Sequence, residues 1–96
     1  MVIKKENVVA NVARATGYSR DAVTYIIEAM FSDIIFAVAN GDKVQFSGFG
    51  TFKPQKRAAR VGRNPRTGES VPIPARILPV FTAGKYLKDA VEREIE

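Results

Sequence analysis

The segment from Arg57 to Arg76 most constrains how this chain can fold, because it is basic and carries few large apolar side chains. Near its middle, Asn64-Pro65-Arg66-Thr67-Gly68 has the residue types of a tight reversal. Each flank holds about eight residues, and two paired strands of that length would reach on the order of 25 Å. Such a ribbon cannot bury its own surface, so we expect an arm that projects from a compact body and becomes fully ordered on a partner.

The positive charge of the chain is concentrated in this arm, which we define as residues 53–76. The arm contains seven basic side chains against one acidic side chain, Glu69, for a net charge of +6. The other residues carry eight basic and nine acidic side chains, so the net +5 of the chain belongs to the arm. Five of the seven cations are arginines, which bind phosphate as a planar fork. This segregation predicts a nucleic-acid partner, and a solvated basic loop is the alternative.

Composition excludes several other classes of protein. Once the arm is subtracted, about 75 of the 96 residues remain to form one core, which favours a dimer. The sequence contains no Cys and no His, so we expect no disulfide, no metal site and no cofactor. The N-terminus has no apolar signal region, and no apolar run is expected to reach membrane-spanning length. A cytoplasmic protein with no membrane partner follows as the expectation.

Two helices are expected before the arm. Apolar residues recur on one face from Lys4 to Ala15, and Gly17 is placed to cap that helix in a left-handed conformation. Ser19 is placed to cap a second helix from Arg20 to Ala39. The second helix is apolar around most of its circumference, which predicts burial on several sides. Another subunit would supply some of those sides, and a central helix of a monomer is the alternative.

The rest of the body is expected to hold a small antiparallel sheet and a last helix. Residues 43–46 and 49–52 have the pattern of a hairpin, and residues 77–81 return to the same sheet after the arm. We assign the three phenylalanines of the hairpin to the core rather than to stacking on single-stranded bases. Thr82 is expected to cap a final helix from Ala83 to about Ile95.

Several short motifs occur along the chain in a specific order and spacing: Gly48-Phe49-Gly50-Thr51-Phe52, Gly62-Arg63-Asn64-Pro65, Thr67-Gly68-Glu69, Pro74-Ala75, Gly84-Lys85 and Leu87-Lys88. With these motifs the chain resembles the HU/integration host factor family of bacterial nucleoid proteins, and the match is closest to HU. The resemblance implies an α+β fold, in which two chains intertwine into a dimer with a helical base and a small antiparallel sheet. Each chain would contribute one protruding two-stranded β-ribbon arm. Residues 1–96 would form a single domain, with 1–52 and 77–96 as the dimerisation body and 53–76 as the DNA-binding arm.

The resemblance further implies architectural binding and bending of double-stranded DNA, largely independent of sequence, in the nucleoid. The arms would enter the minor groove, and Pro65 would wedge between base pairs. The partners would be duplex DNA and a second subunit, either identical or paralogous, with no small-molecule substrate. Glu69 and Pro72 depart from residues found in other members and count against a contact from the return flank near the tip, while the arginine-rich outgoing flank is unaffected. From the charge count and the resemblance together, the candidate DNA-binding residues are Lys5, Ser47, Gly48, Lys53, Lys56, Arg57, Arg60, Arg63, Asn64, Pro65, Arg66, Arg76, Lys85 and Lys88.

The same arm, helices and hydroxyl groups must also be compared with what other functions require. A sequence-preferring bending subunit like integration host factor, or an RNA-binding protein, would use a similar basic arm. A helix-turn-helix regulator built on Thr16-Gly17 would need an exposed basic second helix, whereas this one is apolar. An enzyme is not expected, because without His or Cys the hydroxyls of Ser47, Ser70 and Thr67 have no base at a suitable spacing. Phosphate-loop and dinucleotide fingerprints are also absent from the sequence.

Overall fold

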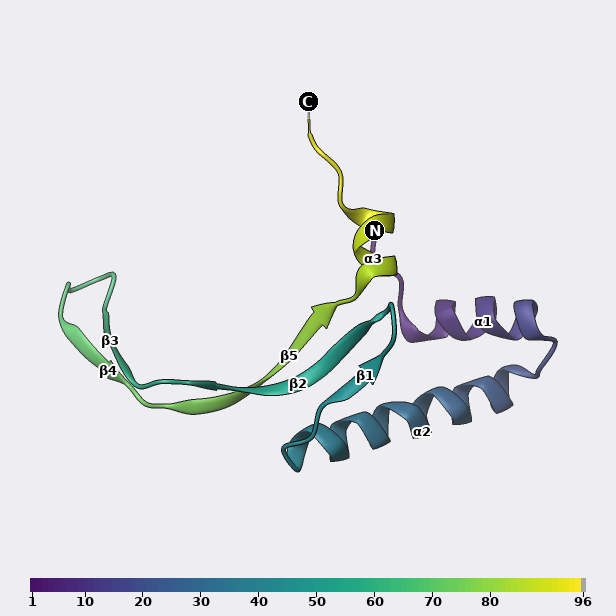
Figure 1. Cartoon of the computed structure of the whole chain (residues 1–96), viewed down its shortest axis with the longest axis horizontal. Coiled ribbons are helices and arrows are strands. Elements are labelled where there is room, and N and C mark those ends of the chain that lie inside the picture. Colours follow the sequence, from purple (N-terminus) through teal and green to yellow (C-terminus); the bar gives the residue numbers. More distant parts are fainter. Residues whose placement is uncertain (96) are drawn as a thin grey trace. The chain divides into compact units, whose positions relative to one another are not determined.

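The computed structural model describes residues 1–95, which form three helices, a three-stranded sheet and a two-stranded sheet (Figure 1). All strand pairs in these sheets are antiparallel. The chain folds as two units, Met1–Phe36 and Ala37–Glu96. The first unit is helical, and the second contains both sheets and the last helix. Helices and antiparallel strands in separate stretches of the chain confirm the predicted α+β class.

The first helix, α1 (Lys5–Thr16), begins and ends one residue later than predicted. Lys4 remains extended at φ −100° and ψ 170°, and its N–H donates to the side-chain oxygen of Asn7 at 3.0 Å. At the other end, Gly17 adopts φ +81° and its N–H donates to the Ala13 carbonyl at 2.9 Å. This confirms the left-handed cap, which glycine adopts without a steric penalty.

The second helix, α2 (Arg20–Ala39), has the predicted bounds. Ser19 caps it, because its hydroxyl accepts the Ala22 N–H at 3.1 Å. Asp21 lies in the first turn, where the positive end of the helix dipole favours a carboxylate. The helix gives way to a turn in which Gly41 adopts φ +91°.

The single chain covers little of the apolar surface of α2, along which only Val23 and Ile34 are buried among the described residues. The helix is long and apolar enough to span a bilayer by length and composition, with a mean hydropathy of 1.7 over its most apolar 18 residues. The expectation that no apolar run reaches that length is therefore wrong. However, Glu28 and Asp33 lie inside the helix and would be costly in hydrocarbon, which favours protein as its cover. The exposed apolar side chains include Tyr25, Ile26, Met30, Phe31, Ile35 and Phe36.

The three-stranded sheet has β2 (Gly50–Arg57) at its centre, between β1 (Val44–Phe46) and β5 (Arg76–Ala83). The turn from β1 to β2 is closed by the Phe49 N–H, which donates to the Phe46 carbonyl at 2.9 Å. Its third residue, Gly48, adopts the φ of +81° that such a tight turn requires and that favours glycine.

A cluster of phenylalanine rings packs on this sheet. The centroids of Phe52 and Phe81 lie 4.7 Å apart, Phe49 lies 5.6 Å from Phe81, and Phe46 lies 6.4 Å from Phe52. Gly50 leaves room for the cluster, because a Cβ at this position would overlap the Phe81 ring. The rings therefore pack against one another, but Phe46, Phe49 and Phe81 remain 38%, 52% and 40% exposed in the single chain, so their assignment to the core stays a prediction.

The last helix, α3 (Lys85–Val91), is shorter than the predicted helix over 83–95. The predicted cap at Thr82 is wrong, because this residue still lies in the β2–β5 ladder opposite Thr51. The N-cap is instead Gly84, which follows directly after β5. The strand continues further than predicted because its ladder with β2 runs on to Ala83.

The arm extends from β2 and β5 and ends in a separate ribbon formed by β3 (Arg60–Arg63) and β4 (Ser70–Ile73) (Figure 1). The two flanks of about eight residues therefore do not pair as one unbroken ladder. Residues 58–59 and 74–75 separate the two ladders and belong to neither. The pairing register is nevertheless the same on both sides, from Arg57 opposite Arg76 to Arg60 opposite Ile73.

Candidate nucleic-acid interface

The tip of the arm is a tight reversal held by backbone hydrogen bonds. The Asn64 N–H donates to the Glu69 carbonyl at 2.9 Å, and the Gly68 N–H donates to the Asn64 carbonyl at 2.7 Å. Gly68 adopts φ +74°, a left-handed conformation that glycine takes without a steric penalty. The structure thus confirms the predicted turn.

Side chains of the tip complete this closure. The Asn64 carboxamide oxygen accepts the Arg66 N–H at 2.9 Å, and Arg63 Nη1 donates to the Gly68 carbonyl at 3.0 Å. The Thr67 hydroxyl accepts the N–H of Glu69, at 3.3 Å. Arg63 and Asn64, both expected to contact DNA, therefore also shape the turn. Pro65 lies between Asn64 and Arg66 and is exposed.

The prolines of the arm and its root lie at positions where the missing N–H removes no hydrogen bond from the ladder. The Gly84 N–H donates to the Phe49 carbonyl at 2.7 Å, and bonded and non-bonded pairs alternate from there. This alternation makes Pro54 and Pro79, which lie opposite each other, a non-bonded pair. In the distal ribbon, the bond from Asn64 to Glu69 likewise makes Pro72 and its partner Val61 a non-bonded pair.

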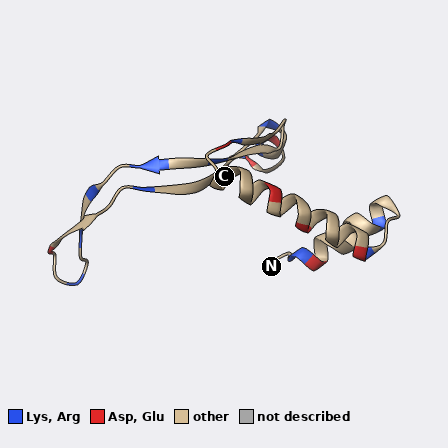
Figure 2. Cartoon of the chain, turned by 90° about the horizontal axis from the view of Figure 1, so that it is seen from below, with Lys and Arg blue, Asp and Glu red and all other residues tan. Residues whose placement is uncertain are grey.

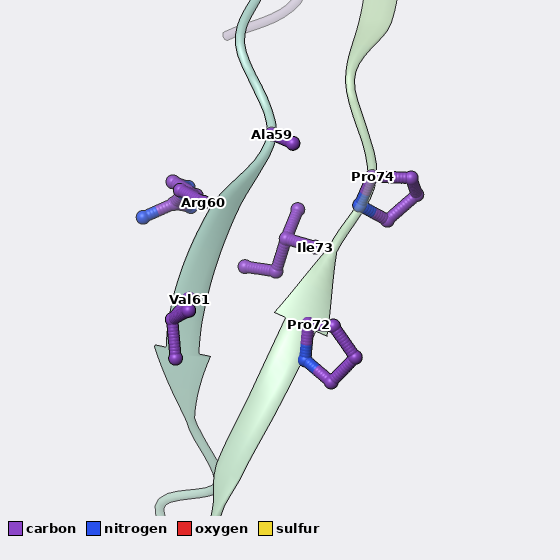
Figure 3. Close-up of a pocket in the computed structure, with 6 residues that line it drawn as sticks. All are labelled: Ala59, Arg60, Val61, Pro72, Ile73 and Pro74. Atoms are coloured by element: carbon purple, nitrogen blue, oxygen red, sulfur yellow. The ribbon is translucent and has the colours of Figure 1, made fainter.

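The outer edge of β4 is blocked by proline. Figure 3 shows the rings of Pro72 and Pro74 on the side of β4 that faces away from β3, with Ile73 between the strands. The side chain of Ile73 also occupies the space over Gly62, where a Cβ would lie 2.8 Å from its Cδ1. Prolines on an outer edge prevent a further strand from pairing, so this edge does not invite strand-to-strand aggregation.

The alternation of bonded and non-bonded pairs does not continue across the break between the two ladders. By the alternation above, Arg57–Arg76 is a bonded pair of the first ladder and Arg60–Ile73 is a bonded pair of the second. Bonded pairs recur at every second residue, so positions three apart cannot both belong to one regular ladder. Two features favour the break. Arg57 opposite Arg76 brings like charges together, and Pro74 has no N–H to donate.

Cationic side chains lie mainly along the outgoing strand of the arm, with Arg66 in the turn and Arg76 on the return strand, and Figure 2 shows a single acidic position near the tip. Lys53 is half-buried in the sheet. Six of the seven cationic side chains form no hydrogen bond or ion pair with the protein within residues 1–95, and all six but Lys53 are exposed. These six are Lys53, Lys56, Arg57, Arg60, Arg66 and Arg76.

Two of the predicted body contacts hold acidic partners in the free chain. Lys5 Nζ lies 2.7 Å from Glu28 Oε1, and Lys85 Nζ lies 2.8 Å from Asp89 Oδ2. Both pairs are well exposed, so each contributes at most about 1 kcal/mol. Lys5 belongs to the first unit, and the structure therefore does not gather it with the other candidates.

The structure brings the Ser47-Gly48 turn together with α3, which carries Lys85 and Lys88. The Gly48 carbonyl accepts the Tyr86 N–H at 2.8 Å. The close approach requires glycine at position 84, because a Cβ there would lie 2.7 Å from the Gly48 carbonyl. Sequence reasoning missed Tyr86, although its place between two lysine-bearing motifs was visible.

The sequence and the arm can now be compared with known proteins. The sequence model of the family described as "Bacterial DNA-binding protein" matches residues 3–92. The chain belongs to this family of bacterial DNA-binding proteins. The chain is similar to DNA-binding protein HU from Geobacillus stearothermophilus, with 47% identity over 90 residues that cover 94% of this chain and 100% of the relative. It is also similar to DNA-binding protein HU 1 from Bacillus subtilis, with 45% identity over 93% of this chain and 97% of the relative.

Solved structures lead to the same family. An Anabaena HU–DNA cocrystal structure matches with a TM-score of 0.85 and 39% identity, covering 93% of this chain and 97% of that chain. An HU mutant from Thermotoga maritima matches with a TM-score of 0.68 and 28% identity, covering 94% of this chain and 100% of that chain. The resemblance to HU predicted from the sequence motifs is thereby confirmed.

Proposed function

We propose that this HU-family chain is an architectural protein that binds and bends double-stranded DNA largely without regard to sequence. The observation that carries the proposal is the arm, a narrow ribbon on which the side chains of Arg57, Arg60 and Arg66 are exposed and have no partner within residues 1–95, with a hydrogen-bonded tip that presents Pro65. The likeness to a HU–DNA cocrystal structure supports it. Such binding would compact the chromosome and assist recombination, replication and transcription in the nucleoid.

The energetics of this function are consistent. Smooth bending of a short site costs on the order of 1–6 kcal/mol, and unstacking adds a few more for each kinked step. Contacts from arginine and lysine to phosphate release counterions and offset that cost without reading any base. The fourteen candidate residues listed above are proposed to provide the contacts, with the arm in the minor groove and the Ser47-Gly48 turn and α3 on the flanking backbone.

The active species is proposed to be a homodimer. Phe31, Ile35 and Phe36 on α2 are 47%, 69% and 71% exposed in the single chain, which is far more apolar exposure than a soluble helix carries. A second copy would cover them and would place a second arm on the same duplex. A paralogous subunit with the same helix would serve equally, and mass spectrometry of the complex isolated from cells would distinguish the two.

The substitution Pro65→Ala tests bending separately from binding. Proline has no N–H, so its compact ring can enter a base step without burying an unpaired donor. The variant should keep most of its affinity and salt dependence, because no cation is removed. It should lose sharp bending, measured as energy transfer between the ends of a short duplex at saturating protein, and lose any preference for nicked DNA.

The matched control is Pro79→Ala, which removes a proline from the body sheet and should leave the bend unchanged. The order of the free tip must also be compared, through the NMR signal of the Arg66 N–H that Asn64 holds. If Pro65→Ala bends DNA as sharply as the unaltered protein while the tip is equally ordered, Pro65 only shapes the turn.

Other functions lead to different results in the same assay. An RNA-binding protein would be competed more strongly by duplex RNA than by duplex DNA. A sequence-preferring bending subunit would show a steep dependence on the sequence of the competitor. A catalytic role is not proposed, since the sequence offers neither His nor Cys as base or nucleophile.

A further inference from the structure

Tyr86 stands out beside the turn that is proposed to bind phosphate. Its backbone is fixed, because its N–H donates to the Gly48 carbonyl at 2.8 Å. Its ring lies against that turn, since a Cβ at Gly48 would overlap its Cδ2 and Cε2 atoms. Even so, Tyr86 is 73% exposed. The ring is therefore anchored along one edge and otherwise open to solvent.

Packing alone does not account for this placement. A residue that packs in the core buries its apolar surface. On α3 the residue that packs in this way is Leu87, which is half-buried. Tyr86 precedes it and leaves most of its ring in water. Within residues 1–95, its hydroxyl forms no hydrogen bond with the protein, so this donor is free for an external acceptor.

We propose that Tyr86 is a further DNA-binding residue, whose hydroxyl donates to a backbone phosphate held at the Ser47-Gly48 turn. This inference rests on the proposed function and deepens it at the body rather than at the arm. Tyrosine hydroxyls are among the groups that contact DNA phosphates and fix the register of a protein on the duplex.

The surroundings favour a neutral donor here. Lys85 is engaged by Asp89 at 2.8 Å, so its charge is partly neutralised before DNA arrives. A phenol has no such competitor and no ion pair to break. In addition, the ring fills the space over Gly48, so the turn is already ordered in the free protein. Less conformational entropy is then lost when the phosphate binds.

The test compares Tyr86→Phe with Tyr18→Phe. Phenylalanine keeps the ring over Gly48 and removes only the hydroxyl, while Tyr18 is an exposed tyrosine of the first unit, at 65%. Binding of a fluorescent duplex is measured by anisotropy over a range of salt concentrations. Tyr86→Phe should raise Kd on the order of ten- to one-hundredfold, as for one lost hydrogen bond to a charged group. The slope of log K against log salt should not change, because no cation is lost.

Each outcome decides the matter. Equal Kd values for Tyr86→Phe and the unaltered protein would overturn the contact, and so would an equal loss in Tyr18→Phe. A weaker Tyr86→Phe whose thermal midpoint also falls would place the residue in folding and overturn it as well. If the unaltered protein fails to bind any duplex, the proposed function fails with it, whereas a normally binding Tyr86→Phe would refute this contact alone.

Discussion

Arg57 and Arg60 together should contribute a measurable part of the salt dependence of DNA binding. Both side chains are exposed and form no hydrogen bond or ion pair within residues 1–95. Arg63, by contrast, donates to the carbonyl of Gly68 at 3.0 Å and shapes the tip. Replacing Arg57 and Arg60 with Ala therefore removes charge without opening the turn, and it also removes the like-charge pair of Arg57 with Arg76.

The magnitude follows from counterion release. Each phosphate contact adds about 0.9 to the slope of log K against log salt, so two lost contacts reduce it by about 1.8 for each arm. Raising the salt from about 50 to 200 mM should therefore weaken the double variant less than the unaltered protein. The fold loss of affinity should be about 12 times smaller if one arm binds and about 150 times smaller if both arms bind. The double variant should also bind more weakly at low salt, and to a similar extent for every duplex sequence.

The measurement is a set of anisotropy titrations at several salt concentrations. Arg14→Ala is the matched control, because Arg14 is an exposed arginine on α1 whose guanidinium donates to the Asn11 side-chain oxygen within its own helix. Its slope should equal that of the unaltered protein. An unchanged slope in the Arg57 and Arg60 variant would refute the assignment of these side chains to phosphate.

Two further predictions concern the fold and the assembly. Gly50→Ala should lower the free energy of unfolding by about 1–3 kcal/mol, because its Cβ would overlap the Phe81 ring and lie 2.8 Å from the Thr82 carbonyl oxygen; an unchanged urea midpoint would contradict this packing. Phe31→Asp should abolish the dimer, since this half-exposed ring on α2 would lie in the interface; a dimer that persists in sedimentation at low micromolar concentration would place the interface elsewhere.

The sequence predicts local features of the body best where one residue type has one physical role. Ser19 before an apolar periodic run and Gly17 after another marked the ends of α1 and α2, because capping and left-handed φ are local requirements. The phenylalanine cluster was also predictable from alternation. The start of α3 was not, because the β2–β5 ladder carries Thr82 past the point where its hydroxyl could cap a helix.

Within the candidate site, charge was predictable and geometry was not. The count of cations between residues 53 and 76 located the arm. The break at residues 58–59 depends on the alternation of hydrogen bonds in two ladders, which no single stretch of sequence reveals. The dual use of Arg63 and Asn64 likewise depends on which carbonyl and which N–H the reversal brings into reach. Tyr86 was missed because its significance lies in contact with a residue 38 positions earlier in the chain, Gly48.

The construction of the tip explains why this arm should bind DNA with little regard to sequence. The two-pronged contact by which asparagine reads adenine lies in the major groove, whereas the arm is proposed to enter the minor groove, where base edges distinguish mainly A·T from G·C. The Asn64 carboxamide, whose oxygen already accepts the Arg66 N–H within the turn, therefore has no base-specific pattern to read there beyond A·T against G·C. Pro65 has no polar side-chain group and can sense only how easily a base step unstacks. Discrimination should therefore follow deformability, with nicked, mismatched and flexible pyrimidine–purine steps preferred over stiff duplex of any sequence.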